Sequence, residues 1–385
     1  MKKVMILSPF FYPELISTGK YNSDLAIQLS ELSIDIEILC SHPLYPDWQV
    51  RRSDKKLNNI KIKRGGGWIK YPDNPIFRRL VLEVWFFFFV CTNVASLRRQ
   101  DAIVAVLPPS SFLIGASIFL GKTKIIGIVH DLQAVHLSSS VSRLKLFLLS
   151  VIKFVERSAF RVCDSLIYLS NEMKKEATEQ YGLHDIESHI VYPFLTIKQF
   201  VKKGALAHLF CSNSFNIVYS GALGDKQAPQ GLFEMAEAII ERSPKSKFIF
   251  FSRGPAFNKL KQKNNHDNII FNDLVDENDL GELLLHSDIQ LIPQAEGTSK
   301  GSLPSKLPNI LASGTKIFSI TDKGSELQML LSQQKGCYIS NSWDPEHNAD
   351  KLLSILSSGL EKVDRIDDLG LYQADRLAKI ITNQI

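Results

Sequence analysis

The chain is 385 residues long, which exceeds the size at which one hydrophobic core usually keeps growing, so two domains are expected. Hydrophobic residues make up 45% and charged residues 22%, the composition of an ordinary globular protein with ample core. The net charge of +5 is compatible with a phosphorylated substrate or an anionic membrane surface. It argues against a nucleic-acid-binding protein, which usually carries a concentrated basic face.

The five cysteines are widely separated, and they form no CxxC pair and no pairing with a nearby histidine. They predict reduced cytosolic thiols rather than disulfides or metal ligands, and they are Cys40, Cys91, Cys163, Cys211 and Cys337. The N-terminus begins with two lysines and an apolar run, as a signal peptide does. Prolines and a glutamate interrupt that run, and no small-residue cleavage site follows, so a buried strand over Val4–Phe10 is the better interpretation.

Alternating helices and strands are expected after this first strand. The expected helices cover 21–32, 77–97 and 144–160, and the expected strands cover 34–40, 102–106, 124–129 and 165–169. This alternation predicts an α/β fold with a parallel sheet covered on both faces.

The same pattern then starts again, which places a domain boundary near Pro193–Val201. Further strands are expected over 217–220, 247–251, 269–271, 289–292 and 316–319, with a helix over 232–240. The expected architecture is two Rossmann-like domains facing a central cleft: 1–198, 199–370, and a terminal helix over 371–385 that could return to the first domain. Ligands of open α/β sheets bind beyond the carboxyl ends of the strands.

The most informative stretch is Gln294–Ile320, which follows an apolar run expected to be a buried strand and passes through a polar loop into a short apolar segment. Lys306 lies near the expected start of a helix, where a cation opposes the helix macrodipole, so its position predicts a bound anion such as phosphate. An exposed lysine without a ligand is the alternative. Pro308 is tolerated only if the helix begins within the preceding three or four residues, which leaves Leu303–Leu307 facing a ligand.

Other strand ends also carry polar residues. In the first domain Gly19 precedes a helix, and His130 with Asp131 could supply a base or donor and an acceptor, although a plain turn, a structural histidine and a capping aspartate are alternatives. In the second domain three strand ends pair a glycine with a cation: Gly224 with Lys226, Gly254 with Arg253, and Gly301 with Lys306. Their convergence predicts a diphosphate site.

Several segments carry a family resemblance. They are YPELISTGKY at the first loop, HPLYPDWQV at 42–50, VERSAFRVCD at 155–164, YSGALGDKQ at 219–227 and LPSKLPNILASG at 303–314. With these segments the chain resembles GT-B glycosyltransferases of the large retaining family four, and most of all the colanic-acid-type fucosyltransferases of bacterial exopolysaccharide and O-antigen assembly.

The resemblance implies transfer of a sugar from a UDP- or GDP-linked donor to a lipid-linked saccharide, with the donor held mainly by the C-terminal domain and the acceptor by the N-terminal one. It assigns His130 and Asp131 to a catalytic place beside the sugar. The donor-binding residues that it implies are Gly19, Gly221, Lys226, Arg253, Leu303, Ser305, Lys306 and Asn309. The acceptor-side residues are Glu14, Lys20, Tyr21 and His42.

The chain departs from the family pattern at three positions. Asn309 and Gly301 stand where the family has paired glutamates, so Asn309 could bond a ribose hydroxyl only without charge. Ala222 replaces a common arginine, so Lys226, Arg253 or Lys306 must carry more of the phosphate charge. No metal is expected, because cations and helix N-termini can neutralise a leaving diphosphate. The resemblance implies retention, although no nucleophile is identifiable.

A conspicuous apolar segment runs from Arg78 to Arg99, and Glu83 and Asn93 interrupt it, so it does not predict a membrane-spanning helix. Either it is a buried domain helix, or it lies on the membrane surface with its aromatic face in lipid. The resemblance favours the second possibility, with polyprenyl-diphosphate-linked acceptors and a peripheral position on the inner face of the cytoplasmic membrane. The expected membrane contacts are Arg78, Arg79, Trp85, Phe86, Phe87, Phe88 and Phe89.

Two other classes of function remain. A GT-B nucleotide-sugar epimerase would share the architecture but would need no lipid acceptor. A non-catalytic protein that binds sugar nucleotides would explain the missing glutamate pair. Turnover with donor alone, and with donor plus acceptor, distinguishes the three.

Overall fold

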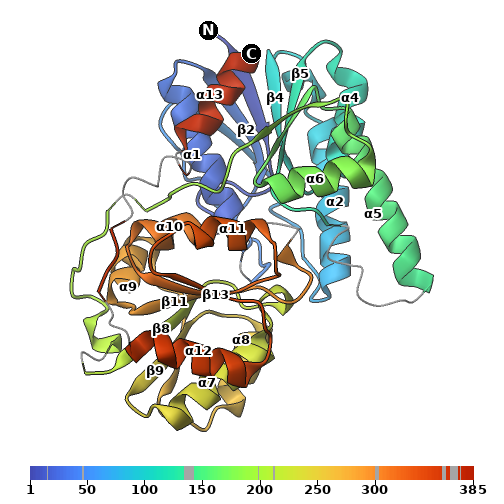
Figure 1. The fold of residues 1–385 in the computed structure, drawn as a ribbon. Coiled ribbons are helices and arrows are strands. Elements are labelled where there is room, and N and C mark those ends of the chain that lie inside the picture. Colours follow the sequence, from blue (N-terminus) through green and yellow to red (C-terminus); the bar gives the residue numbers. More distant parts are fainter. Residues whose placement is uncertain are drawn as a thin grey trace. The chain divides into compact units, whose positions relative to one another are not determined.

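The computed structural model describes residues 1–385 except 15, 46, 134–142, 198, 211–212, 300–302, 358–360, 365–371 and 373. The chain divides into two compact units (Figure 1). The first contains Met1–Tyr192 together with Gln373–Ile385, and the second contains Pro193–Tyr372. The C-terminal segment thus belongs to the first unit, and the second unit begins six residues before the sequence-based boundary at 199.

The described residues of the first unit form a seven-stranded parallel sheet in the order β3-β2-β1-β4-β5-β6-β7. Its strands are β1 (Lys3–Leu7), β2 (Asp35–Ser41), β3 (Ile60–Gly65), β4 (Ala102–Leu107), β5 (Lys124–Val129), β6 (Ser165–Tyr168) and β7 (Glu187–Ile190). All six residues of β4 are buried, as expected for a parallel strand with helices on both faces.

The helices of this unit cover both faces of the sheet. They are α1 (Ser17–Glu31), α2 (Pro75–Cys91), α3 (Val94–Leu97), α4 (Ser111–Leu120), α5 (Arg143–Arg161), α6 (Asn171–Tyr181) and α13 (Asp375–Gln384). Helices α1 and α13 pack together, and Gln384 ties α13 to the sheet by accepting a 2.7 Å hydrogen bond from the Ser165 hydroxyl. On the other face α4 packs between α2 and α5.

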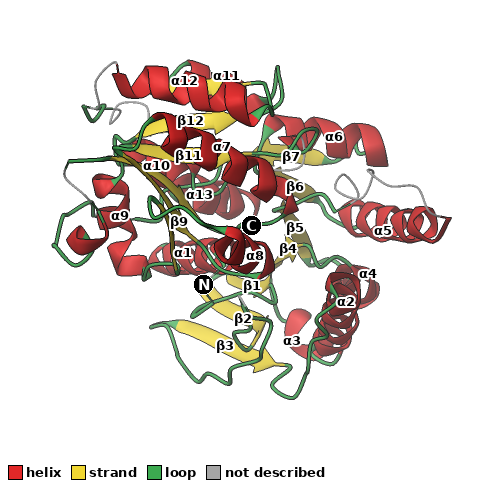
Figure 2. Cartoon of the chain, turned by 90° about the horizontal axis from the view of Figure 1, so that it is seen from below, coloured by secondary structure: helices red, strands yellow, loops and turns green. Residues whose placement is uncertain are grey.

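The second unit has a six-stranded parallel sheet in the order β10-β9-β8-β11-β12-β13. Its strands are β8 (Phe215–Ser220), β9 (Ser246–Phe251), β10 (Ile269–Asn272), β11 (Ile289–Pro293), β12 (Lys316–Ile320) and β13 (Cys337–Ser340). Its helices are α7 (Pro229–Arg242), α8 (Pro255–Lys263), α9 (Leu280–His286), α10 (Leu307–Ala312), α11 (Glu326–Ser332) and α12 (Pro345–Ser357). Helices α7 and α12 pack together over this sheet, and Figure 2 shows the strands of each unit among its helices.

The expected α/β architecture is confirmed, and every expected strand is present. The sequence analysis missed β3, β7 and β13 and the helices α4, α6, α8, α9, α11 and α12. β3 escaped because lysines and an arginine alternate with its apolar residues, as an edge strand allows. α4 escaped because its sequence, SFLIGASIFL, is too uniformly apolar to show a helical period.

Each sheet has one point where the strand order reverses. In the first sheet it lies between β1 and β4, and in the second it lies between β8 and β11. Open parallel sheets bind their ligands outside the carboxyl ends of the strands at such a point. These two places therefore position the candidate site residues.

Candidate functional site

Lys306 lies at the reversal point of the second sheet. Its ammonium donates hydrogen bonds to the carbonyl oxygens of Ser220, the last residue of β8, at 3.2 Å and of Leu291 in β11 at 2.8 Å. It also lies 4.2 Å from the centre of the Tyr219 ring. The Ser220 hydroxyl donates to the side chain of the buried Gln290, which ties the end of β8 to β11.

The Lys306 side chain has an unusual electrostatic environment. Burial lowers its pKa to about 7, and no described carboxylate pairs with it. An ammonium has three donors, and the described residues accept from two of them. A partly buried cation without a counter-ion is unfavourable, so the position is suited to an anionic ligand.

Helix α10, which follows Lys306, begins where Pro308 allows it to begin. Lys306 is the residue before α10, and Pro308 occupies the first turn, where its missing N–H costs no hydrogen bond. Leu303 is buried and Ser305 is partly buried on the approach to this turn. Gly301, which stands at one of the family's glutamate positions, lies outside the described residues.

Arg253 and Lys226 are the other cations of the second unit that were expected to bind the diphosphate. The Arg253 guanidinium, after β9, donates to the Asp273 carboxylate at 2.7 Å, so it is paired on the side toward β10. Lys226 is partly buried, and its carbonyl accepts from the Ala295 N–H. Gly221 has a φ of 125° and no atom within 4 Å of the place where a side chain would begin. The backbone there requires glycine and leaves open space at the end of β8.

The structure contradicts the expected role of Asn309. This residue is only 6% exposed, and its carbonyl oxygen accepts from the backbone N–H groups of Thr196 at 3.0 Å and Ile197 at 3.1 Å. Its amide nitrogen donates to the Thr196 hydroxyl at 2.9 Å. The carboxamide therefore anchors segment 196–197 to α10 and has no oxygen lone pair left for a ribose hydroxyl.

In the first unit, His130 follows β5 and stacks on Tyr21 of α1, with ring centres 6.1 Å apart. Burial lowers the pKa of His130 to about 4, and the neighbouring Asp131 carboxylate opposes this shift only in part. The imidazole is therefore neutral at pH 7. It can accept or donate one hydrogen bond to a ligand, but it is not a protonated general acid.

We expect the fold to lose stability in acid through His130. Its pKa in the folded state is below the unfolded value of about 6.5, so the unfolded state binds the proton more readily and stability rises with pH between 4 and 6.5. The difference corresponds to about 3 kcal/mol. His130→Gln should flatten the dependence of the melting temperature on pH across this window. An unchanged slope would contradict the assignment.

Three residues expected on the acceptor or donor side have structural roles instead. The buried Glu14 carboxylate accepts hydrogen bonds from the backbone N–H groups of Leu44 at 2.8 Å and Tyr45 at 3.0 Å, so it clamps this loop and does not face an acceptor. A side chain on Gly19 would begin 2.9 Å from the Glu14 side chain, so close packing there accounts for this glycine. Tyr21 is buried beneath His130, and burial raises the pKa of its hydroxyl. Lys20 is partly buried in the first turn of α1.

The aromatic segment is a core helix along most of its length. Phe86 is fully buried, and Trp85 is buried with its indole N–H donating to the Tyr71 hydroxyl at 2.6 Å. Phe87 fills the space beside Gly115 of α4, where an added side chain would begin 2.5 Å from its ring. Trp85 and Phe86 are therefore wrong as membrane contacts, because both are buried in the core. Phe87 is partly buried against α4.

One side of α2 does face outward. Arg79 and Phe88 are exposed as expected, whereas the Arg78 guanidinium is held 4.3 Å above the Trp48 ring. The sequence analysis missed most of the exposed apolar residues on this side. The outer face of α2 comprises Ile76, Phe77, Leu80, Val84 and Phe88, which are spaced by one helical turn or nearly so.

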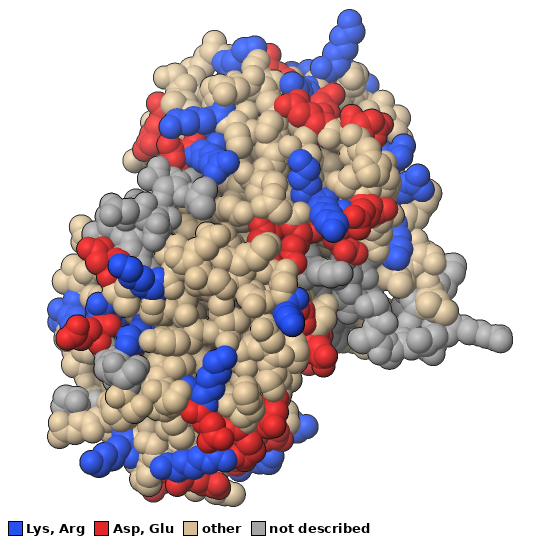
Figure 3. Space-filling model, in the orientation of Figure 1, with Lys and Arg blue, Asp and Glu red and all other residues tan. Residues whose placement is uncertain are grey.

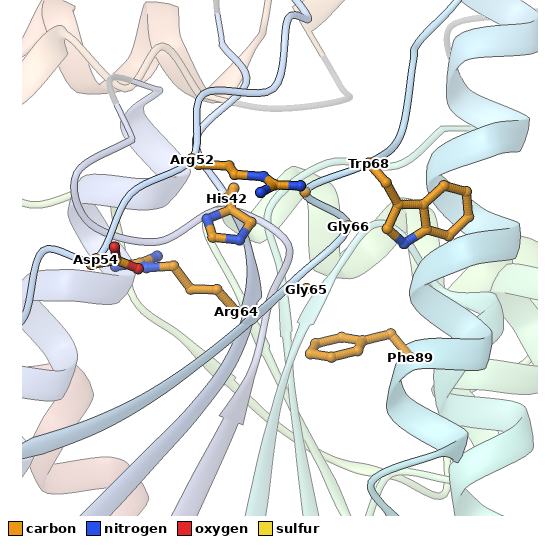
Figure 4. Close-up of a pocket in the computed structure, with 9 residues that line it drawn as sticks. His42, Arg52, Asp54, Arg64, Gly65, Gly66, Trp68 and Phe89 are labelled. Atoms are coloured by element: carbon orange, nitrogen blue, oxygen red, sulfur yellow. The ribbon is translucent and has the colours of Figure 1, made fainter.

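His42 and Phe89 line a cavity of about 610 Å³ beside the ends of β2 and β3 (Figure 4). Its other lining residues are Arg52, Asp54, Arg64, Gly65, Gly66, Gly67 and Trp68. Only His42 was expected to face an acceptor. The signal for the others was a glycine triplet between an arginine and a tryptophan, RGGGW, at the end of an undetected strand.

Comparison with known proteins gives consistent results for the fold. No family model matches the chain. The protein WcaI of Escherichia coli (strain K12), named as a colanic acid biosynthesis glycosyl transferase, is 25% identical over 354 residues, which cover 85% of each chain. Among solved structures, sucrose-phosphate synthase of Thermosynechococcus elongatus has a TM-score of 0.77 at 11% identity and covers 100% of this chain and 98% of its own.

WaaG, a glycosyltransferase involved in lipopolysaccharide biosynthesis, has a TM-score of 0.74 at 12% identity and covers 98% of this chain and 99% of its own. The chain has the GT-B fold. A GT-B neighbour from Staphylococcus aureus, MnaA, was solved with UDP, at a TM-score of 0.58 and 12% identity, covering 97% of this chain and 90% of its own. The TM-scores and coverages of the solved structures establish the fold of the chain, and the similarity to WcaI supports glycosyltransferase activity.

Among the residues that the structure describes, no helix is both long and apolar enough to cross a membrane. Within the same residues, no group of three His, Cys, Asp or Glu side chains is arranged to hold a metal ion.

Proposed function

We propose that the protein transfers a sugar from a UDP- or GDP-linked donor to a polyprenyl-diphosphate-linked saccharide in bacterial surface polysaccharide synthesis. The observation that carries this proposal is the Lys306 ammonium, a partly buried cation without a carboxylate partner at the reversal point of the second sheet. A nucleotide diphosphate would supply the missing negative charge. The similarity to WcaI over most of both chains supports the same reading.

The proposed reaction needs charge stabilisation more than proton transfer to the leaving group. The bond between the anomeric carbon and the diphosphate oxygen breaks, the acceptor oxygen forms the new bond, and the hydroxyl proton passes to the diphosphate. Lys306 offsets the charge that develops on the leaving diphosphate, which is the role that a metal ion has in other transferases. We therefore propose metal-independent transfer, and the family resemblance supports retention at the anomeric carbon. The neutral His130 imidazole would hold a sugar hydroxyl in the first unit.

A thermal-shift panel of UDP, GDP, CDP and dTDP in EDTA tests the donor site. A ligand that binds only the native state raises the melting temperature by mass action. We expect the diphosphate of the correct base to raise it and the matching nucleoside, which lacks phosphate, to have little effect. If none of the four diphosphates stabilises the protein in EDTA, the metal-independent donor site is wrong.

The lowered pKa of Lys306 predicts that diphosphate binding depends on pH. A bound anion favours the protonated lysine, so above pH 7 binding must take up a proton and the affinity should fall by up to about tenfold per pH unit. The nucleotide itself contributes little there, because phosphate titrates near pH 6. Calorimetry at pH 7, 8 and 9 measures this effect. Lys306→Arg keeps the charge without titrating, so its affinity should not change over this range, and equal slopes in both proteins would contradict the role of Lys306.

We also propose that the outer face of α2 rests on an anionic membrane surface. Its five apolar side chains form a stripe along the helix, and the exposed Arg79 lies beside them for contact with headgroups. Helix α5, on the other side of α4, adds the exposed residues Leu146, Val151 and Phe154. On the side of the molecule drawn in Figure 3, basic and acidic side chains are interspersed. The proposed membrane contact rests on the exposed apolar side chains of α2.

A further inference from the structure

The cavity beside β2 and β3 lies in the most basic part of the sequence. Residues 51–70 contain eight lysines and arginines and a single carboxylate, Asp54. With eight cations and one carboxylate, this segment has a net charge of +7. Asp54 also lines the cavity, and two of the cations, Arg52 and Arg64, line it with His42.

Two donors converge in this cavity. The backbone N–H of Ser53 donates to the His42 Nδ1 atom at 3.2 Å, so in the neutral ring the proton is on Nε2. Burial lowers the pKa of His42, which favours this neutral form. A side chain on Gly67 would begin 3.3 Å from His42 Nε2 and 3.4 Å from Arg52 Nε. The glycine thus leaves room at a point where both donors are within hydrogen-bonding reach of a ligand atom.

The two arginines are not neutralised in the same way. Arg64 donates to the carbonyl oxygens of Tyr12, Ser41 and Lys55, which fix its guanidinium without cancelling its charge. No described residue forms a hydrogen bond or an ion pair with the Arg52 side chain. Its neighbour Arg51, by contrast, is paired with Asp47. The cavity is therefore lined by two arginine charges, of which Arg64 is fixed by backbone carbonyls and Arg52 is unpaired. Asp54 is the single carboxylate among its lining residues.

An aromatic side chain completes the rim. Trp68 is 79% exposed, although a tryptophan normally buries most of its surface. Figure 4 shows it beyond Gly66 on the side of α2, with Phe89 below it on that helix. An indole exposed beside unpaired donors offers a flat apolar surface next to an anion site, which is what a sugar carrying a negative group requires.

We propose that this cavity binds the anionic group of a saccharide acceptor, a phosphate or a carboxylate, with the attached sugar ring on Trp68. The proposal rests on the proposed glycosyl transfer, because it assigns the cavity to the acceptor of that reaction. His42 Nε2 and Arg52 Nε would donate to the anion at the place that Gly67 leaves open. Arg64 would add charge from behind.

Ligand-detected NMR titrations on the full chain test the proposal, with glucose 1-phosphate, glucuronate and neutral glucose as probes. We expect one or both anionic sugars to bind and glucose to bind far more weakly; the preferred probe identifies phosphate or carboxylate as the group. Arg52→Gln should weaken the binding about tenfold or more, because it removes a hydrogen bond to a charged group. Arg51→Gln is the matched control, since it removes the same charge from a paired neighbour.

Two further variants test the geometry. Gly67→Ala should abolish binding, since its methyl group would occupy the place between the two donors. Trp68→Ala should lower the affinity for glucose 1-phosphate to that for inorganic phosphate. Equal losses in Arg52→Gln and Arg51→Gln, binding of glucose as tight as that of the anionic sugars, or no binding of either anionic sugar would overturn the proposal.

The same variants separate this proposal from the donor site. Arg52→Gln and Gly67→Ala should keep the thermal shift that nucleotide diphosphates produce, because the cavity lies in the first unit and Lys306 lies in the second. An intact diphosphate shift without anionic-sugar binding rejects the cavity alone. Binding of anionic sugars without any diphosphate shift rejects the glycosyl transfer and with it the acceptor assignment.

Discussion

Lys306→Gln is expected to weaken nucleotide diphosphate binding by roughly 30-fold or more and to abolish sugar transfer. Glutamine retains an N–H donor but loses the charge, and the loss of a charge-assisted hydrogen bond in a partly buried site costs about 2 kcal/mol or more. The effect on turnover should exceed the effect on binding, because the charge on the diphosphate increases as its bond to the sugar breaks. Calorimetry and a transfer assay measure the two effects.

Two controls separate this result from damage to the fold. Lys259→Gln removes a lysine from the exposed side of α8 in the same unit and should leave diphosphate affinity unchanged. The Lys306 ammonium also satisfies the carbonyls of Ser220 and Leu291, so the melting temperature of each variant without ligand must be recorded. If Lys306→Gln folds normally and binds diphosphate as well as the wild type does, the donor site is not at the reversal point.

Replacing Phe77, Leu80 and Phe88 together by serine is expected to lower binding to anionic phospholipid vesicles by roughly 100-fold. Each of these exposed side chains would lose about 1 kcal/mol of burial in the lipid interface. The melting temperature should change little, because the three side chains already face water in the free protein. Vesicle sedimentation with phosphatidylglycerol measures the partition.

Matched substitutions serve as controls for this prediction. Leu32→Ser and Met329→Ser each remove an exposed apolar side chain that is not on α2, and neither should affect vesicle binding. Phe86→Ser, from the buried side of α2, should instead destabilise the fold by about 3 kcal/mol or more. If the triple variant binds vesicles as the wild type does and instead changes the sedimentation coefficient, the outer face of α2 is a contact between copies of the chain.

The architecture could be predicted because parallel strands that are buried on both faces can be recognised in the sequence as short apolar runs. The run KIIGIV became β5 with the expected bounds, and the apolar run at 289–292 became β11. The placement of Lys306 beside a strand end was also predictable. Because the carboxyl ends of parallel strands share one edge, a cation after β11 had to lie near that edge.

The partners of the polar residues could not be predicted. Asn309 and Glu14 are residue types that often bind ligands. Each instead accepts hydrogen bonds from two backbone N–H groups of a segment far away in the sequence. A buried carboxylate or carboxamide is as valuable for clamping a loop as for binding a substrate. Sequence spacing alone does not distinguish these uses, because tertiary contacts decide which N–H groups donate to these oxygens.

The aromatic segment shows a similar limit. The family resemblance favoured assigning four consecutive phenylalanines to lipid, whereas consecutive helical residues point 100° apart and cannot all share one face. Phe86 points to the core, Phe88 outward, and Phe89 to the cavity. A helical projection of the same segment would have found the stripe from Ile76 to Phe88.

The most direct measurement is acceptor-dependent release of nucleotide diphosphate. The protein is incubated in EDTA with UDP- and GDP-sugars, with and without a polyprenyl-diphosphate-linked saccharide, and both the released diphosphate and the remaining donor are quantified. The proposed function predicts release from one donor class only when the acceptor is present, and none with Lys306→Gln. Conversion of the donor sugar without acceptor would indicate an epimerase, and an unchanged donor in every mixture would contradict catalysis.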